Sequence, residues 1–232
     1  MLGLGNSISA SQYTEGGFVD PTSLSGLQIW LKNDTGITTA SSAAASDGDL
    51  VYGWADSSGN SNDATASSQR FEYIESEGGI LSTPALGNSL LNLPQLTLPE
   101  FSIFMKVKFS SISSGSTDMF LLDKDTSSSF FRIQNATSIK AKVNTSTPTS
   151  WTVSTISLDT YYTINVVRES GVGGSIFIDG VQQDATKNVG GQDMVIDRIG
   201  SVFNGVIKNF VVYDRVLTAN ERKLVRLHVQ AQ

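Results

Sequence analysis

The chain has 232 residues, of which 39% are hydrophobic and 16% are charged, and its net charge is −6. This length and composition predict one domain with a large core and exclude a disordered chain. The negative charge and the scattered cations argue against a nucleic-acid-binding groove, which needs clustered lysine and arginine. Cysteine is absent, which excludes disulfides and thiolate metal sites.

Residues 1–24 are rich in Ser, Gly and Gln and show no sustained hydrophobic period. We expect an N-terminal arm that is either a loose terminus or a segment that docks on a partner. The apolar residues available for docking are Leu2, Leu4, Ile8, Tyr13 and Phe18.

The start of the chain lacks the basic stretch and the long apolar core of a secretory signal. No apolar run approaches the ~20 residues that span a bilayer. We therefore expect a protein that is made in a cytoplasm and is not inserted into a membrane.

Residues 25–232 show a rhythm of short strands. The clearest is the segment 101–109, where Phe101, Ile103, Met105, Val107 and Phe109 form one apolar face with a single break at Phe104. Strands separated by polar turns predict an all-β sandwich rather than alternating βαβ units. Further strands are expected at residues 27–32, 70–74, 79–82, 90–93, 118–122, 130–134, 139–143, 151–154, 161–168, 175–179, 194–199 and 206–213.

The end of the chain carries three local signals. Asp179-Gly180 between apolar strands predicts a tight hairpin. Residues 206–213 are apolar on both faces, as in a strand buried between two layers. Thr218 and Glu221 form a capping box, which predicts a helix from residue 218 to about residue 229.

That helix should pack on the sandwich through Ala219, Leu224 and Leu227, although Arg222 stands where a hydrophobic staple would place an apolar partner for Leu217. We interpret its cations as favourable charges at the negative end of the helix dipole. They are Arg222, Lys223, Arg226 and His228.

The hairpin, the buried strand and the capped helix, in that order, resemble the end of a laminin-G-like, concanavalin-A-type jelly-roll domain. Residues 27–32 and the turn segment 54–65, which contains Trp54, Asp56 and Asn60, resemble its opening. The resemblance implies a jelly-roll β-sandwich over residues 25–232 with a short C-terminal helix. Residues 3–7 are also similar to the starts of structural proteins from tailed phages of marine bacteria, which implies a virion component.

Catalytic candidates are few. Glu75 and Glu77 are the only pair of acids that would share a strand face, Glu72 would not join them, and a solvated strand end explains them better than a glycosidase site. His228 is the single histidine, which excludes a multi-histidine metal site. We assign no catalytic, cofactor-binding or metal-binding residue.

The segment 56–63 supplies Asp56, Asn60, Asn62 and Asp63, whose oxygens are the hard ligands that calcium prefers. Their spacing does not match the well-defined calcium loop. We favour a turn in which these side chains bond their own backbone, with calcium as the alternative.

Glycan recognition would use exposed aromatic residues beside polar groups. The candidate contacts are Trp54, Trp151 and Tyr52, with Tyr161 and Tyr162 also available, and all of these are equally often core residues.

The sequence thus predicts a non-enzymatic structural protein of a phage particle, located in the virion as a capsid decoration or a tail- or fibre-associated adhesion module. It would act through contacts with other virion proteins, in several copies or as a homo-oligomer. The alternative is a carbohydrate-binding module for host surface glycans, and a glycan-cleaving enzyme is the third hypothesis.

Overall fold

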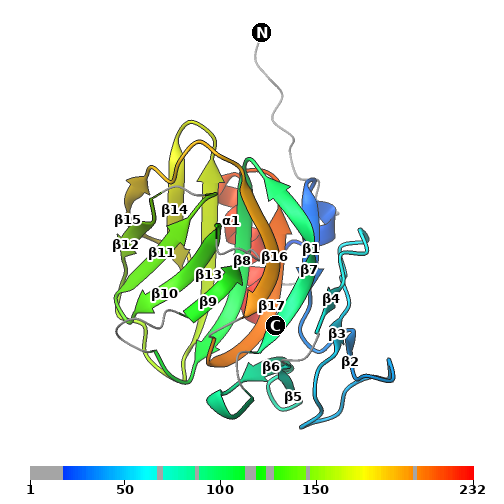
Figure 1. Ribbon diagram of the computed structural model, residues 1–232. Coiled ribbons are helices and arrows are strands. Elements are labelled where there is room, and N and C mark those ends of the chain that lie inside the picture. The colour runs from blue at the N-terminus through cyan, green and yellow to red at the C-terminus, as the bar shows by residue number, and fades with distance from the viewer. Residues whose placement is uncertain are drawn as a thin grey trace.

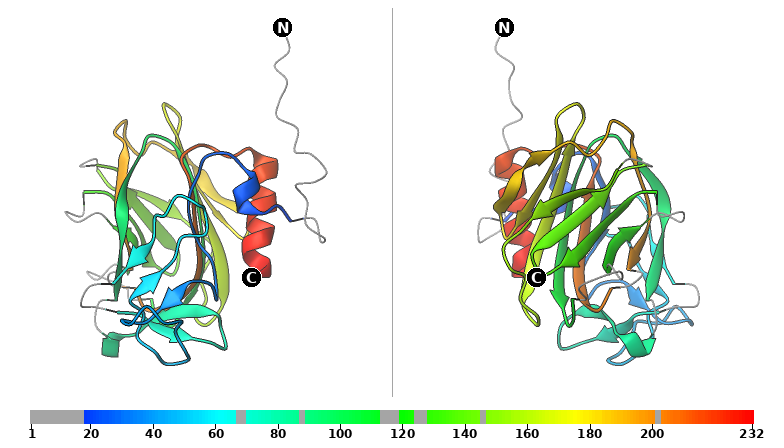
Figure 2. Two further views of the ribbon diagram at one scale, coloured as in Figure 1. Left: turned by 90° about the vertical axis from the view of Figure 1, so that its right-hand side faces the viewer. Right: turned by 60° about the vertical axis from the view of Figure 1, so that its left-hand side comes forward.

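The computed structural model describes residues 18–66, 70–86, 89–112, 119–123, 128–144, 147–200 and 203–232. Over these residues the chain forms two stacked β-sheets and one C-terminal helix, α1 (Ala219–Ala231), which lies against the outer face of one sheet (Figures 1 and 2). The expectation of an all-β sandwich with a short C-terminal helix is therefore confirmed.

We name the sheet that carries α1 the helix sheet. In the described residues it contains eight strands in the order β15-β14-β13-β8-β17-β6-β5, with β1 paired to β17. Their bounds are β1 Leu27–Leu31, β5 Glu72–Ile74, β6 Gly79–Ser82, β8 Phe101–Phe109, β13 Tyr161–Glu169, β14 Gly173–Ile178, β15 Val181–Lys187 and β17 Gly205–Tyr213.

The second sheet is named the opposite sheet. Within the described ranges it has nine strands in the order β12-β11-β10-β9-β16-β7-β4-β3-β2. Their bounds are β2 Ile37–Thr38, β3 Gly53–Trp54, β4 Ala64–Thr65, β7 Leu90–Leu98, β9 Met119–Asp123, β10 Phe130–Asn135, β11 Ser138–Lys142, β12 Thr149–Thr152 and β16 Met194–Gly200. Two 3-10 turns complete the described chain, Pro21–Ser23 and Pro84–Leu86.

Most strand predictions hold within two residues at each end, and β6 and β8 have the predicted bounds. The exception is β7, which extends from Leu90 to Leu98 where residues 90–93 were expected. The two-residue strands β2, β3 and β4 were not predicted, and β15 was expected only as the second strand of the hairpin, without bounds. A two-residue pairing or a strand of exposed polar residues leaves no hydrophobic period to detect. The hairpin is confirmed: Asp179 (φ 50°) and Gly180 (φ 86°) join β14 to β15.

Two hydrophobic clusters hold the layers together. The larger lies between the sheets and contains Ile103, Met105 and Val107 from β8. The smaller lies between the helix sheet and α1 and contains Phe104 and Val211. The break in the period of β8 is thereby explained, since Phe104 faces the helix while its neighbours face the core. The prediction that β17 is buried between two layers is confirmed as well.

Helix α1 begins as the sequence predicts. Thr218 Oγ1 accepts from the backbone N–H of Glu221, and the Glu221 carboxylate accepts from the N–H of Thr218, so the capping box is complete. The buried residues of the helix are Leu224, Val225 and Val229. The expectation that Ala219 and Leu227 pack on the sandwich is wrong. Ala219 is exposed and Leu227 is only half-buried, because the helix presents a different side to the sheet.

The dipole interpretation of the helix cations is also corrected. Arg222 and Lys223 lie near the start of α1 and Arg226 near its middle, so these three cannot act at the negative C-terminal end. Only His228 lies in the last turn, and burial lowers its pKa, which disfavours the charged form. Its ring makes an edge contact with Trp30, with 5.5 Å between the ring centroids.

The described chain begins close to α1. Val19 and Leu24, which we assigned to the N-terminal arm, are buried in the small cluster beside Leu224 and Val225. The hydroxyl of Tyr213 donates to the carbonyl of Pro21 at 3.0 Å, which ties this segment to β17. Within the described residues, packing therefore already includes Val19 and Leu24, which precede residue 25. Of the five proposed docking residues, Phe18 is half-buried, and the other four lie outside the described residues.

Candidate functional site: a basic groove beside the terminal helix

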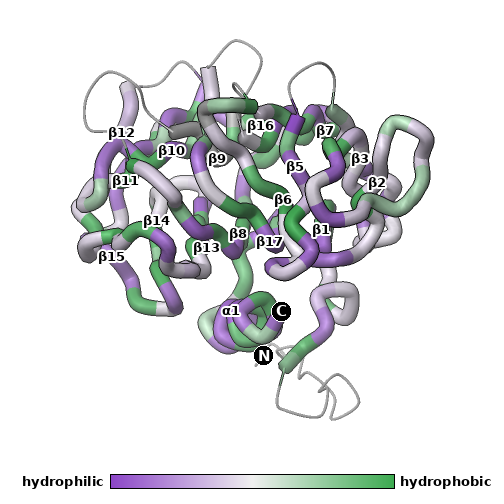
Figure 3. The backbone as a smooth tube through the Cα atoms, turned by 90° about the horizontal axis from the view of Figure 1, so that it is seen from below, coloured by the Kyte–Doolittle hydropathy of each residue, from purple (hydrophilic) through white to green (hydrophobic). Residues whose placement is uncertain are grey.

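A groove of about 290 Å³ opens between α1 and the strands β8, β13 and β14. In the view of Figure 3, α1 is drawn just below the strands β13, β8 and β17 of the helix sheet. The lining residues combine three cations with two aromatic rings and contain no acid: Phe104, Asn165, Phe177, Gly180, Ala219, Arg222, Lys223 and Arg226.

Arg222 is held on two sides. Its Nη1 donates to the carbonyl oxygen of Leu217 at 2.6 Å, and its guanidinium lies over the ring of Phe177, 5.0 Å from the centroid. The backbone bond occupies the place of the missing hydrophobic staple. Burial lowers the pKa of Arg222 below its ordinary value, so the guanidinium loses some solvation but stays charged at neutral pH.

Arg226 is one turn further along α1, on the same side of the helix as Arg222. Its Nη1 donates to Gln230 Oε1 at 2.5 Å. The guanidinium packs on the tip of the β14–β15 hairpin, where a Cβ added to Gly180 would lie 2.6 Å from Arg226 Nε. A turn residue chosen for its positive φ thus also makes room for a groove cation.

The floor of the groove comes from adjacent strands. Asn165 on β13 pairs with Phe104 on β8 and with Phe177 on β14, so all three side chains lie in one row across the helix sheet. Phe104 is fully buried, and Phe177 is half-buried. Asn165 Nδ2 donates to the carbonyl of Ile103 at 2.9 Å, which leaves Oδ1 as the acceptor that this side chain can offer.

This arrangement suits a small anionic ligand with hydroxyl groups. Two neighbouring guanidinium groups match a carboxylate geometrically, since each presents a planar fork of donors. The half-buried ring of Phe177 offers an apolar surface, and Asn165 offers an acceptor. A second cavity, between the two sheets and lined by Phe101, Trp151 and Met194 among others, holds only about 10 Å³ and has no room for a ligand.

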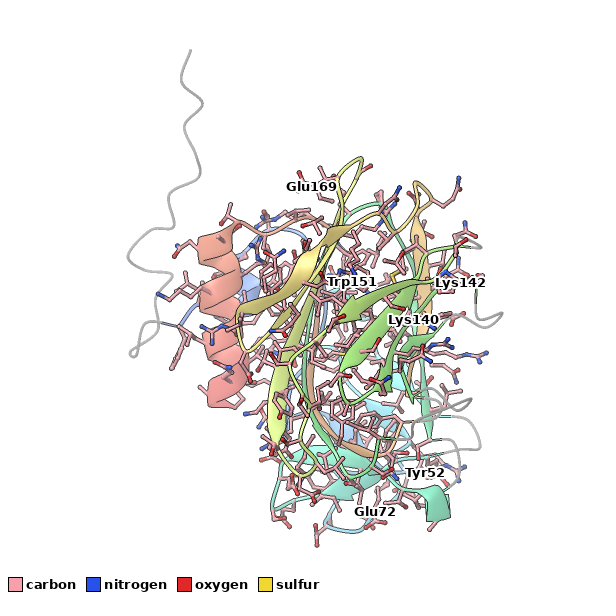
Figure 4. All side chains as sticks on the ribbon, turned by 90° about the vertical axis from the view of Figure 1, so that its left-hand side faces the viewer. Tyr52, Glu72, Lys140, Lys142, Trp151 and Glu169 are labelled. Carbon is pink, nitrogen blue, oxygen red and sulfur yellow. The ribbon has the colours of Figure 1, made fainter. Side chains whose placement is uncertain are left out.

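The predicted glycan contacts do not lie in this groove. Trp54 and Trp151 are 0% and 1% exposed, so neither ring reaches the surface, and we correct both as candidate contacts. Trp54 fills the core and donates from Nε1 to the carbonyl of Lys32. Figure 4 shows Trp151 inside the sandwich. Large apolar rings contribute more to the stability of the fold when they are buried between sheets than when they remain exposed.

Tyr52 lies at another end of the molecule, near Glu72 (Figure 4). Its ring is half-buried and is covered by the guanidinium of Arg70, 3.9 Å from the centroid. It therefore has no part in the groove.

The candidate acids are separated by the structure. Strand β5 ends at Ile74, so Glu75 and Glu77 lie in a turn and share no strand face. Glu75 is exposed, while Glu77 pairs with Lys108 and accepts from the Tyr161 hydroxyl. They do not form the pair of facing carboxylates that a glycosidase uses.

The segment 56–63 forms a hydrogen-bonded turn, the interpretation that the sequence favoured. Asp56 accepts from the backbone N–H groups of Trp30, Ser58 and Asn62, while the amide of Asn60 donates to the carbonyl of Leu27. Asp63 accepts from the N–H of Asp56. Over the residues that the structure describes, no three His, Asp or Glu side chains gather as a metal site. No helix among them is long and apolar enough to cross a membrane.

The groove cations were visible in the sequence but were assigned another role. The signal that could have found them is the spacing of Arg222 and Arg226, which puts two arginines on one side of a helix. Their opposition to Phe177 and Asn165 was not predictable, because those residues come from strands about 50 residues earlier in the chain.

Together, the two stacked sheets and the closing helix define a β-sandwich of the lectin type. A family model described as the concanavalin A-like lectin/glucanases superfamily matches residues 86–221. The chain belongs to this superfamily. No curated protein sequence matches the chain.

Solved structures agree on the fold. A sialidase from Trypanosoma rangeli, in complex with a difluorinated nononic acid, superposes with a TM-score of 0.61 at 14% identity over 97% of this chain and 36% of that chain. The binding domain of Paraclostridial Mosquitocidal Protein 1 gives 0.56 at 14% identity, over 76% of this chain and 51% of that one. Botulinum neurotoxin type C, whose structure concerns interaction with two ganglioside molecules, gives a TM-score of 0.59 at 15% identity. The match covers 88% of this chain and 51% of the neurotoxin chain.

These similarities contradict our prediction of a protein without enzymatic activity. That prediction rested on the small number of catalytic candidates, and the fold itself also occurs in chains of sialidases, so it does not argue against catalysis. At 14% identity the likeness shows the fold alone, and this chain spans about a third of the length of the sialidase chains. The sialidase activity belongs to those proteins.

Proposed function

We propose that the protein is a glycan-recognition module that holds an acidic sugar in the groove beside α1. The observation that carries this proposal is the placement of Arg222 and Arg226 on one side of α1, above Phe177 and Asn165. The two guanidinium groups would hold a carboxylate, and the half-buried ring of Phe177 would contact the apolar face of the sugar. Asn165 Oδ1 would accept from a hydroxyl group.

Two comparisons support an acidic glycan. A Trypanosoma rangeli sialidase has been solved with sialic acid, and the neurotoxin structure concerns gangliosides. Both share the sandwich fold with this chain.

The proposal is tested by binding of the purified chain to an array that pairs sialylated oligosaccharides with their desialylated forms. We expect binding to the sialylated members and at least tenfold weaker binding to the others, since hydrogen bonds to charged groups contribute about 1.5–3 kcal/mol each. Arg226→Gln should weaken binding by a similar factor. Lys140→Gln, which removes the same charge from the opposite sheet on the side away from α1 (Figure 4), should leave it unchanged.

A folded protein that binds no member of the array would disprove the proposal. Equal binding by the wild type and by Arg226→Gln would place the ligand elsewhere.

As the setting, we propose a phage particle, on which several copies of the module would contact other virion proteins and meet host glycans. Support comes from the similarity of residues 3–7 to the starts of tailed-phage structural proteins. Mass spectrometry of purified particles tests this setting, and absence of the chain from them would refute it.

A further inference from the structure

A second cluster of cations lies on the helix sheet beyond the end of α1. The ammonium groups of Lys106, Lys108 and Lys208 surround the ring of Tyr161, at 5.7, 5.2 and 5.0 Å from its centroid. All four side chains are half-buried, so they keep part of their surface in contact with solvent.

The strand register brings these side chains together. Lys106 and Lys108 alternate with the core residues of β8, and Tyr161 of β13 is directly opposite Lys108. On β17, Ile207 and Phe210 both belong to the core between the sheets, and the register shifts after Ile207. Two residues therefore bulge outward between them, and one of these is Lys208.

The cluster has too few negative charges to balance it. Among the described residues the cluster contains one carboxylate, that of Glu77. This carboxylate forms a salt bridge with Lys108 and accepts a hydrogen bond from the Tyr161 hydroxyl. Lys106 donates to the carbonyl of Gln230 at 2.7 Å, near the C-terminal end of α1. The ammonium of Lys208 makes no hydrogen bond or salt bridge within the described part of the chain.

Three ammonium groups against one carboxylate leave a surplus of two positive charges in a chain whose net charge is −6. Burial lowers the pKa of Lys106 and Lys208, and Lys208 lowers the pKa of Lys106 further. For Lys208 the attraction of Glu77 opposes the effect of burial, and the repulsion of Lys108 adds to it. Like charges held together in a partly desolvated place repel each other, and an added anion would relieve that repulsion.

We infer that Lys106, Lys108 and Lys208 form a second binding site, for the sulfate or phosphate group of an esterified sugar. Lysine is a compact point charge with three rotatable donors, and three lysines that converge from two strands suit the several oxygens of a tetrahedral anion. The arginines of the groove, with planar forks, suit a carboxylate instead.

The two sites are distinct. Along β8 the groove residue Phe104 is followed by Lys106 and then Lys108 on the same face, so Lys108 is four residues, or roughly 13 Å, from Phe104. Gln230 stands between the sites: its carbonyl accepts from Lys106, and its side chain accepts from Arg226 and donates to Asp179. The lysine site therefore does not depend on the ligand proposed for the groove.

The experiment is calorimetric or NMR titration of the full chain at pH 7 and constant ionic strength, with inorganic sulfate and inorganic phosphate as probes. Galactose 6-sulfate and galactose 6-phosphate then distinguish the two esters. We expect saturable binding that Lys208→Gln weakens about tenfold, because it removes one charge-assisted contact. Lys208 is chosen because its removal breaks no hydrogen bond among the residues that the structure describes.

Glu77→Gln gives a result of opposite sign. Removing the carboxylate that competes for Lys108 should tighten sulfate binding several-fold, whereas a purely structural role for Glu77 would weaken it or leave it unchanged. Lys142→Gln, on the opposite sheet, is the charge-matched control and should leave binding as in the wild type.

The inference is overturned if the wild type shows no saturable binding, if Lys208→Gln binds as the wild type does, or if Lys142→Gln weakens binding equally. Arg226→Gln should retain sulfate binding. A wild type that binds sulfate but binds no sialylated glycan would refute the groove proposal alone.

Discussion

Gly180 at the tip of the β14–β15 hairpin lies against the guanidinium of Arg226, so that a Cβ at Gly180 would be 2.6 Å from Arg226 Nε. The hairpin turn and the shape of the groove are therefore coupled through one missing methyl group. A glycine that the sequence explains as a turn residue is also part of the candidate binding site.

Gly180→Ala should both strain the turn and displace Arg226. We expect a loss of about 1–2 kcal/mol in unfolding free energy, the usual cost of a left-handed conformation for a residue with a Cβ, together with weaker glycan binding. Gly171→Ala is the matched control, since Gly171 has φ 74° and nothing within 4 Å of its added Cβ. It should lose similar stability and keep its binding; equal loss of binding in both variants would contradict the coupling.

The two buried tryptophans should differ in their tolerance of phenylalanine. Trp54 Nε1 donates to the carbonyl of Lys32 at 2.9 Å, whereas Trp151 Nε1 is buried with no hydrogen-bond partner among the described residues. Trp54→Phe should therefore cost about 1 kcal/mol more than Trp151→Phe, the net contribution of one hydrogen bond. Denaturant unfolding of both variants measures the difference, and a larger cost for Trp151→Phe would refute the assignment.

The start of α1 should show a dependence on acid. Hydrogen bonds from Arg215 lower the pKa of Glu221 most strongly, burial opposes this, and the capping bonds lower it further. Because the folded-state pKa lies below the ordinary value of 4.5, this stabilisation is complete above pH 4.5 and is lost as the pH falls through the folded-state value.

Comparison of the wild type with Glu221→Gln from pH 7 to pH 3 tests this dependence. The stability difference should shrink on acidification; a constant difference would show that the carboxylate charge does not matter. Thr218→Ala, which removes the other half of the cap, should cost about 1 kcal/mol at pH 7.

The hydroxyl of Tyr73 should lose its proton at a higher pH than that of an ordinary tyrosine. Burial, followed by a hydrogen bond and charge repulsion from Asp34, raises the pKa of Tyr73 to about 12 from 10. A raised folded-state pKa means that the associated stability is complete below pH 10 and is lost as the pH rises towards 12. Ultraviolet absorbance of tyrosinate in the wild type and in Tyr73→Phe measures the shift, and titration of this residue near pH 10 would contradict it.

The long strands were predictable because alternation with period two is local. The sequence of β8 places five apolar residues on one face, and any structure that buries them must form such a strand. The capping box at Thr218 and Glu221 and the turn at Asp179 and Gly180 were predictable for the same reason, since each satisfies its own backbone within a few residues. The phenylalanine that broke the period, Phe104, was an early sign of the second layer.

The candidate sites were not predictable, because their members come from distant strands. Trp54 and Trp151 are of the residue type that often contacts glycans, but only the stacking of the sheets determined that both are buried. Lys106 and Lys208 are about 100 residues apart and look scattered until β8 and β17 pair.

By itself, then, the amino-acid order determined most of the apolar strands, the start of the helix, and that the fold is an all-β sandwich. Their physical basis is local, in side-chain alternation, turn conformation and capping. Only the tertiary structure decided which charges meet, because strand register and the orientation of α1 bring Arg226 to Gly180 and three lysines to Tyr161. A binding surface on this protein is a consequence of packing, and packing joins residues that the chain keeps apart.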